Sequence, residues 1–198
     1  MSQILSNMKA VLGDLKRFGL SFTLIGGFAV SLRTRPRTTK DIDFSIAVEN
    51  DGQAEDVVRK LITSGYRNGA VLEHEATGRL ATVRFYLPDS ESSEPDLDLM
   101  FCSCGIENEI VAGSSTINMP NVGKLPVART GHLIAMKVLS QNDRRETDRA
   151  DLRNLFAVAS SVDLEIAEKS IELIIERGFH RDKDLKRDYR FFAASAEG

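Results

Sequence analysis

The chain has 198 residues, of which 42% are hydrophobic and 28% charged, a composition typical of a soluble globular protein with one domain, with or without a small appendage. Its formal net charge of −3 provides no overall basic field, which disfavours a long nucleic acid as the partner. The first residues carry no basic leader pattern and no stretch has the apolar length of a membrane span, so we expect a cytoplasmic protein without a membrane partner.

Helix and strand patterns alternate in the first part of the chain. The expected elements are a helix from Ile4 that ends near Gly19, a strand over 21–25, a helix over 28–32, a strand over 41–46, a helix over 54–62, and strands over 70–74, 80–87, 96–101 and 117–119. Pro36 makes the basic stretch 33–40 a loop. The sheet is therefore expected to end near residue 125.

From Thr130 onward the pattern is helical only. Helices are expected over 130–139, 146–159 and 163–177, the last followed by Gly178. The charged stretch 181–192 is predicted to form a loosely packed helix, and its mixed charges favour a salt-bridged surface over an RNA-binding patch.

Paired carboxylates mark two of the predicted strands. Residues two apart on a strand share a face, so Asp41 and Asp43 project together, and Asp96 and Asp98 do the same on a later strand. Unpaired carboxylates that gather in one place repel, and such a cluster normally holds a hard cation such as Mg²⁺ or Mn²⁺. The sequence therefore predicts a divalent-cation site built from these strands.

A glycine pair lies between a predicted strand and a predicted helix. Gly26 and Gly27 allow the backbone to approach a ligand closely, and the N-terminus of the following helix presents free N–H groups. This turn is a candidate phosphate cradle.

These motifs resemble a known superfamily. Gly26-Gly27, then Asp41-Ile42-Asp43-Phe44, then Leu97-Asp98-Leu99 resemble the polymerase beta superfamily of nucleotidyltransferases, and the chain is most similar to its AbiEii-like and other small (minimal) members. The segments 125–128, 133–137 and 145–152 look like the lysine and aspartate segments of those relatives. Many relatives carry Gly-Ser where this chain has Gly-Gly.

The resemblance implies an α+β fold. We expect a nucleotidyltransferase core over residues 1–125, with a mixed β-sheet flanked by helices, and a C-terminal helical segment over 126–198 that packs on the core. The alternative is that both parts form one single domain. The order of predicted elements supports this expectation independently.

The resemblance also implies roles for individual residues. Asp41 and Asp43 would bind the cation that bridges a nucleoside triphosphate, while Asp98 would complete a second cation site and help to deprotonate the acceptor hydroxyl. The triphosphate would lie against the backbone of Gly26 and Gly27. Lys137 and Arg37 would neutralise it, with the other arginines of the 33–37 loop as further candidates.

The implied reaction is transfer of a nucleoside monophosphate to an acceptor hydroxyl with release of pyrophosphate. The acceptor could be a tRNA end, a protein side chain or a small molecule, and the resemblance favours a toxin with an antitoxin partner over an antibiotic adenylyltransferase. A rival hypothesis is a non-catalytic module that binds a nucleotide or a partner protein, and another is a purely structural cation site. The nucleotide base and the oligomeric state stay open.

Three further acids have open or different assignments. Asp96 lies at a strand start beside Pro95, and we expect it on the surface. Asp148 and Asp151 lie in the first turns of a helix, where the helix dipole stabilises acids, so that a structural role and a role in the site both stay open.

Overall fold

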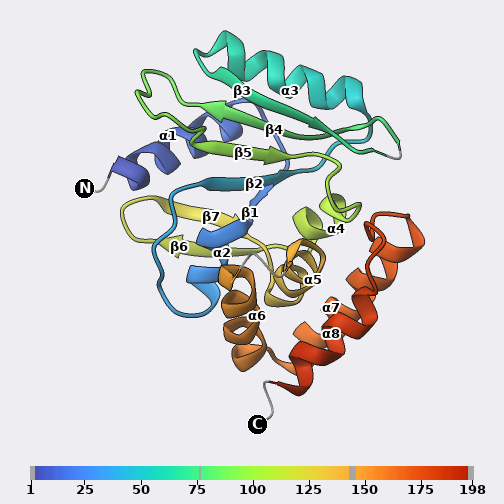
Figure 1. Cartoon of the computed structure of the whole chain (residues 1–198). Coiled ribbons are helices and arrows are strands. Elements are labelled where there is room, and N and C mark those ends of the chain that lie inside the picture. The colour runs from blue at the N-terminus through green and yellow to red at the C-terminus, as the bar shows by residue number, and fades with distance from the viewer. Residues whose placement is uncertain (1–2, 76, 143–145, 196–198) are drawn as a thin grey trace.

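The chain folds around one sheet in the computed structural model, which describes residues 3–75, 77–142 and 146–195. In chain order its strands are β1 (Phe22–Leu24), β2 (Ile42–Ile46), β3 (Arg67–Glu73), β4 (Leu80–Tyr86), β5 (Leu97–Met100), β6 (Ser115–Met119) and β7 (Gly123–Val127). They lie side by side in the order β3-β4-β5-β2-β1-β7-β6 (Figure 1). Sequence order and spatial order therefore differ most in the middle of the sheet.

The sheet is mixed. Strand β2 pairs in parallel with β5 and β1 in parallel with β7, whereas β1–β2, β3–β4, β4–β5 and β6–β7 are antiparallel. Parallel neighbours need a crossover connection, and a helix with the β3–β4 hairpin supplies it between β2 and β5. The expected α+β fold with a mixed sheet is confirmed.

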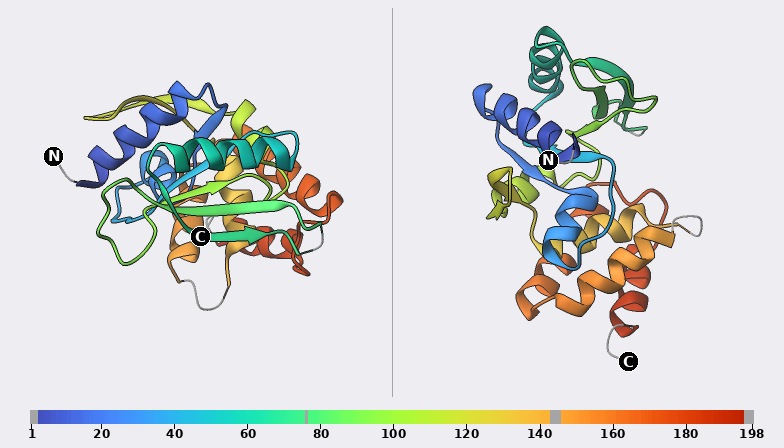
Figure 2. Two further views of the ribbon diagram at one scale, coloured as in Figure 1. Left: turned by 90° about the horizontal axis from the view of Figure 1, so that it is seen from above. Right: turned by 90° about the vertical axis from the view of Figure 1, so that its left-hand side faces the viewer.

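Helices cover both faces of this sheet. In the described residues they are α1 (Gln3–Arg17), α2 (Gly26–Arg33), α3 (Asp51–Thr63), α4 (Glu107–Ala112), α5 (Thr130–Ser140), α6 (Glu146–Val158), α7 (Ser161–Glu176) and α8 (Leu185–Ala194). Helices α1 and α3 lie on one side, and α2 lies on the other side with the C-terminal helices, which gather at one end of the molecule (Figures 1 and 2). None of these helices is long and apolar enough to span a membrane.

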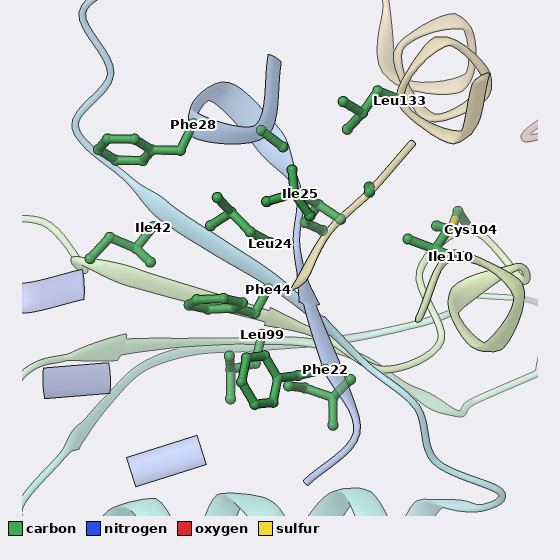
Figure 3. Close-up of a cluster of buried hydrophobic side chains, with 14 of the residues drawn as sticks. Phe22, Leu24, Ile25, Phe28, Ile42, Phe44, Leu99, Cys104, Ile110 and Leu133 are labelled. Atoms are coloured by element: carbon green, nitrogen blue, oxygen red, sulfur yellow. The ribbon is translucent and has the colours of Figure 1, made fainter. Parts of the chain in front are cut away.

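Alternation along the central strands fixes the core. Ile42, Phe44 and Ile46 of β2 are fully buried, as the alternating pattern predicts for one face of a strand. The ring of Phe44 meets that of Phe22 edge-on with centroids 5.5 Å apart, and Leu99 of β5 joins them (Figure 3). Because this face is filled with apolar side chains, the polar residues of the same strands are left for the opposite face.

Three local expectations need correction. Strand β7 was not predicted, since Gly123 and Pro126 resemble a turn, and it carries the sheet to Val127. The short helix α4 was also missed. Helix α8 is not loosely packed, because Leu185, Tyr189 and Phe192 are buried against the other C-terminal helices. Its apolar residues are few but lie on one face.

Candidate active site

The turn between β1 and α2 places glycine backbone directly above β2. Gly26 has a φ of 63°, in the left-handed region that favours glycine, and a Cβ atom at this position would collide with the carboxylate of Asp43. The Ile25 N–H donates to the Asp43 carbonyl at 2.9 Å, and the Gly27 N–H donates to the Asp43 carboxylate. The N-terminus of α2 therefore opens onto an acidic side chain.

Two of the predicted acids are neighbours across parallel strands. Asp43 of β2 and Asp98 of β5 occupy aligned positions, so that their side chains share a face of the sheet. Asp98 is aligned in turn with Arg84 of β4, whose Nε lies 3.3 Å from its Oδ2. Asp41 precedes β2 and faces the same cleft. A row of charged side chains thus crosses three strands.

Burial and mutual repulsion change the acidity of this group. Burial, followed by the negative charges of Asp98 and Asp41, raises the pKa of Asp43 to about 7, although Lys137 and the Gly27 N–H oppose the shift. Burial also raises the pKa of Asp98, with the positive charge of Arg84 acting against it. Burial is the largest cause of both shifts, and neighbouring negative charges add to it.

A second network holds the predicted phosphate-binding cations. Asp151 of α6 is buried and accepts two hydrogen bonds of 2.8 Å from the guanidinium of Arg37. The ammonium of Lys137 on α5 lies 2.9 Å from Asp151 and 2.6 Å from Asp148. Asp148 and Asp151 therefore position the two cations and join the 33–40 loop to α5 and α6.

All seven residues predicted for cation and triphosphate binding line one cleft of about 440 Å³. Its lining residues are Ile25, Gly26, Gly27, Arg37, Thr39, Asp41, Asp43, Arg84, Asp98, Met100, Leu133, Met136, Lys137, Ser140, Thr147 and Asp148. The cleft thus joins the glycine turn, the carboxylates of the sheet and the first two C-terminal helices.

A family model describes nearly the whole chain. The model of the nucleotidyl transferase AbiEii toxin of type IV toxin–antitoxin systems matches residues 11–197. The chain belongs to this AbiEii family. The resemblance to small nucleotidyltransferases that the motifs predicted is confirmed.

A solved structure shares the fold of this AbiEii chain. An antigenic nucleotidyltransferase-like protein from Paracoccidioides brasiliensis superposes with a TM-score of 0.57 at 15% identity, over 96% of this chain and 93% of that one. A lincosamide antibiotic adenylyltransferase bound to lincomycin has a TM-score of 0.46 at 18% identity, over 80% of this chain and 98% of that one. No curated protein sequence matches this AbiEii chain significantly.

Some residues considered from the sequence lie elsewhere in this AbiEii protein. Arg33 donates to the carbonyls of Val127 and Ala128, both at 2.9 Å, and so ties α2 to the end of β7 instead of facing the cleft. Asp96 accepts a hydrogen bond of 2.6 Å from Ser90 and holds the turn before β5. Arg145, part of a segment that suggested the AbiEii resemblance, lies outside the described residues.

Arg84 is a charged residue of the cleft that the sequence analysis missed. Its strand was predicted, and Thr82 and Arg84 form the polar face of that strand. The missing information was the pairing of β4 with β5, which aligns Arg84 with Asp98. A polar face can be recognised in a sequence, but its neighbour depends on strand order.

The donor set of this AbiEii cleft fits a hard divalent cation, because carboxylate oxygens are the ligands that Mg²⁺ and Mn²⁺ prefer. Within residues 3–75, 77–142 and 146–195, however, no three His, Cys, Asp or Glu side chains are already gathered as a cation site. Asp98 is engaged by Arg84 instead.

Proposed function

We propose that the chain transfers a nucleoside monophosphate from a nucleoside triphosphate to an acceptor hydroxyl in a reaction that depends on Mg²⁺ or Mn²⁺. The observation that carries this proposal is the alignment of Asp43 with Asp98 beneath the Gly26–Gly27 turn. The carboxylates of such a pair can bind a divalent cation, and the N–H groups of the adjacent helix N-terminus can bind a phosphate.

The acceptor oxygen would attack the α-phosphorus while the bond to pyrophosphate breaks. Asp41, Asp43 and Asp98 would hold the divalent cations, which supply charge stabilisation for the attacking and leaving oxygens. Asp98 would also take the proton of the acceptor hydroxyl.

The triphosphate would lie along the glycine turn. The N–H groups at the start of α2 provide donors for its oxygens. Arg37 and Lys137 are held beside this turn by buried acids, so their positive charges face the cleft in a fixed arrangement. Preorganised cations of this kind stabilise charge without reorganisation during the reaction.

The biological role that we propose is that of a toxin with an antitoxin partner. The family description, a nucleotidyl transferase toxin of a toxin–antitoxin system, supports this role. The acceptor classes to be tested are tRNA ends, protein side chains and small molecules, antibiotics among them.

The test is a transfer assay with the full chain. Wild-type protein and the double variant Asp41→Asn with Asp43→Asn are incubated with each labelled triphosphate, Mg²⁺ or Mn²⁺, and a cell extract, and label is followed into RNA, protein and small molecules. Asparagine keeps the size of the side chain and removes its charge, so both proteins are expected to fold.

We expect the wild type alone to transfer label and release pyrophosphate, and the labelled fraction names the acceptor class. Nucleotide binding by folded wild type without transfer and without pyrophosphate would favour a non-catalytic module. Melting that responds to Mn²⁺ but not to any triphosphate would favour a structural cation site.

A further inference from the structure

Arg84 occupies an unusual place in the cleft. It sits on β4, outside the three motifs that define the family resemblance, and its guanidinium lies against Asp98 with an Nε to Oδ2 distance of 3.3 Å. The side chain of Arg84 is 46% exposed, whereas that of Asp98 is only 15% exposed. The arginine side chain therefore reaches solvent, whereas the aspartate side chain is mostly covered.

The other cations that line the cleft are held differently. Arg37 and Lys137 have side chains that are 27% and 15% exposed, and each pairs with the buried Asp151 of α6. Asp151 belongs to neither strand of the acidic pair. Of the basic side chains that the structure describes in the cleft, Arg84 is thus the one that pairs with an acid proposed to bind the divalent cation.

We propose that Arg84 couples cation binding to nucleotide binding: it pairs with Asp98 before a ligand binds, gives up this pair when a divalent cation binds, and then binds a phosphate of the nucleoside triphosphate. This inference rests on the proposed function for the identity of its ligands. It makes Arg84 a positioning and phosphate-binding residue that the sequence motifs do not include.

Elementary electrostatics supports the exchange. A divalent cation and the guanidinium compete for the same carboxylate and also repel each other at short range, so that Arg84 opposes binding of the cation alone. A triphosphate brings several negative charges to the cleft and gives the released guanidinium a new partner. By linkage, each ligand then favours the binding of the other.

The test uses two ligands and one matched control. Mn²⁺ binding to the full chain is measured by titration calorimetry with and without a non-hydrolysable triphosphate analogue, for wild type, Arg84→Met and Arg79→Met. Arg79 pairs with Asp51 at 3.2 Å outside the cleft, and its side chain has a similar exposure of 38%. Melting curves of the three proteins confirm that each is folded.

The expected signature has opposite signs for the two ligands. Arg84→Met should bind Mn²⁺ alone roughly three- to ten-fold more tightly, because a competing pair of this exposure is weak to moderate in strength. At saturating Mn²⁺ the same variant should bind the analogue more weakly than wild type. Arg79→Met should match wild type in both measurements. If Arg84 had a merely structural role, Arg84→Met would bind both Mn²⁺ and the analogue more weakly.

The outcomes separate this inference from the proposed function. Equal Mn²⁺ affinities in wild type and Arg84→Met would overturn the role of Arg84 and leave nucleotidyl transfer standing. If Arg84→Met changes the affinities for Mn²⁺ and for the analogue in opposite directions but the wild type transfers no label, the role of Arg84 is supported and nucleotidyl transfer is overturned. If neither protein binds Mn²⁺ in the presence of the analogue, both proposals fail.

Discussion

Asp43 and Asp98 lie at aligned positions of two parallel strands, and each is partly buried. Two carboxylates so arranged repel each other, and burial together with the negative charges of Asp98 and Asp41 raises the pKa of Asp43 to about 7. The folded chain without a cation therefore carries an electrostatic cost at neutral pH. A bound cation would remove this cost, which links stability, pH and ligand binding.

The first prediction concerns pH and Asp43. A folded-state pKa above the ordinary value of 3.8 means that the protonated form is favoured in the folded chain, so the contribution of Asp43 to stability is fully present below pH 3.8 and lost as pH rises to about 7. Asp43→Asn stays neutral. Without divalent cations, we expect the unfolding free energy of Asp43→Asn to be higher than that of the wild type by roughly 2–4 kcal/mol above pH 7. Near pH 4 the two unfolding free energies should differ little.

Urea unfolding in the presence of a chelator, at pH values between 4 and 8.5, measures this difference. Asp56→Asn serves as the control, since its carboxylate is exposed on α3 and, within the described residues, forms an ion pair with Arg59. A difference between Asp43→Asn and wild type that does not change with pH would contradict the prediction.

The second prediction concerns the buried acid beneath the phosphate-binding cations. The side chain of Asp151 is 1% exposed and pairs with Arg37 and Lys137. Asp151→Asn removes the negative charge that neutralises the partly buried Arg37 and Lys137. This should lower the unfolding free energy by about 3 kcal/mol. The exposed pair of Asp56 and Arg59 is worth less than about 1 kcal/mol, so Asp56→Asn should change little. Chemical denaturation compares the two, and equal losses would count against a structural role for the network.

The third prediction concerns the glycine turn. Gly26 and Gly19 have nearly the same φ, 63° and 68°, but a Cβ would collide with Asp43 at Gly26 and meet nothing within 4 Å at Gly19. Substitution by alanine should cost roughly 1 kcal/mol of backbone strain at either position. Only Gly26→Ala should also displace Asp43 and lose nucleotide binding, as followed by thermal shift with a triphosphate. Retained binding in Gly26→Ala would show that the turn does not cradle the ligand.

The fourth prediction separates two acids of the same strand region. Asp98 faces the cleft, whereas Asp96 holds a turn through Ser90. Asp98→Asn should reduce transfer by roughly 100- to 1,000-fold, the usual cost of removing one charge-stabilising group. Asp96→Asn should keep the transfer rate and lose at most about 1 kcal/mol of stability. Similar rates in the two variants would remove Asp98 from the reaction.

The local patterns of the sequence determined a large part of this protein. The alternation around Asp41 and Asp43, the glycines before α2 and the helical spacing of the C-terminal half each depend on residues close together in the chain, and local sterics and hydrophobic periodicity are sufficient to predict them. The family membership followed from the same short motifs, and the family model confirmed it.

Tertiary structure alone decided which side chains meet. The alignment of Arg84 with Asp98 depends on β4 pairing with β5, and the pairing of Asp151 with Arg37 joins residues 114 positions apart. Periodicity gives the face of each strand but not its neighbour, because strand order is set by packing of the whole core. For the same reason β7 and the packing of α8 escaped the local patterns: a strand with Gly and Pro, and a charged helix, are stabilised by the elements that they contact.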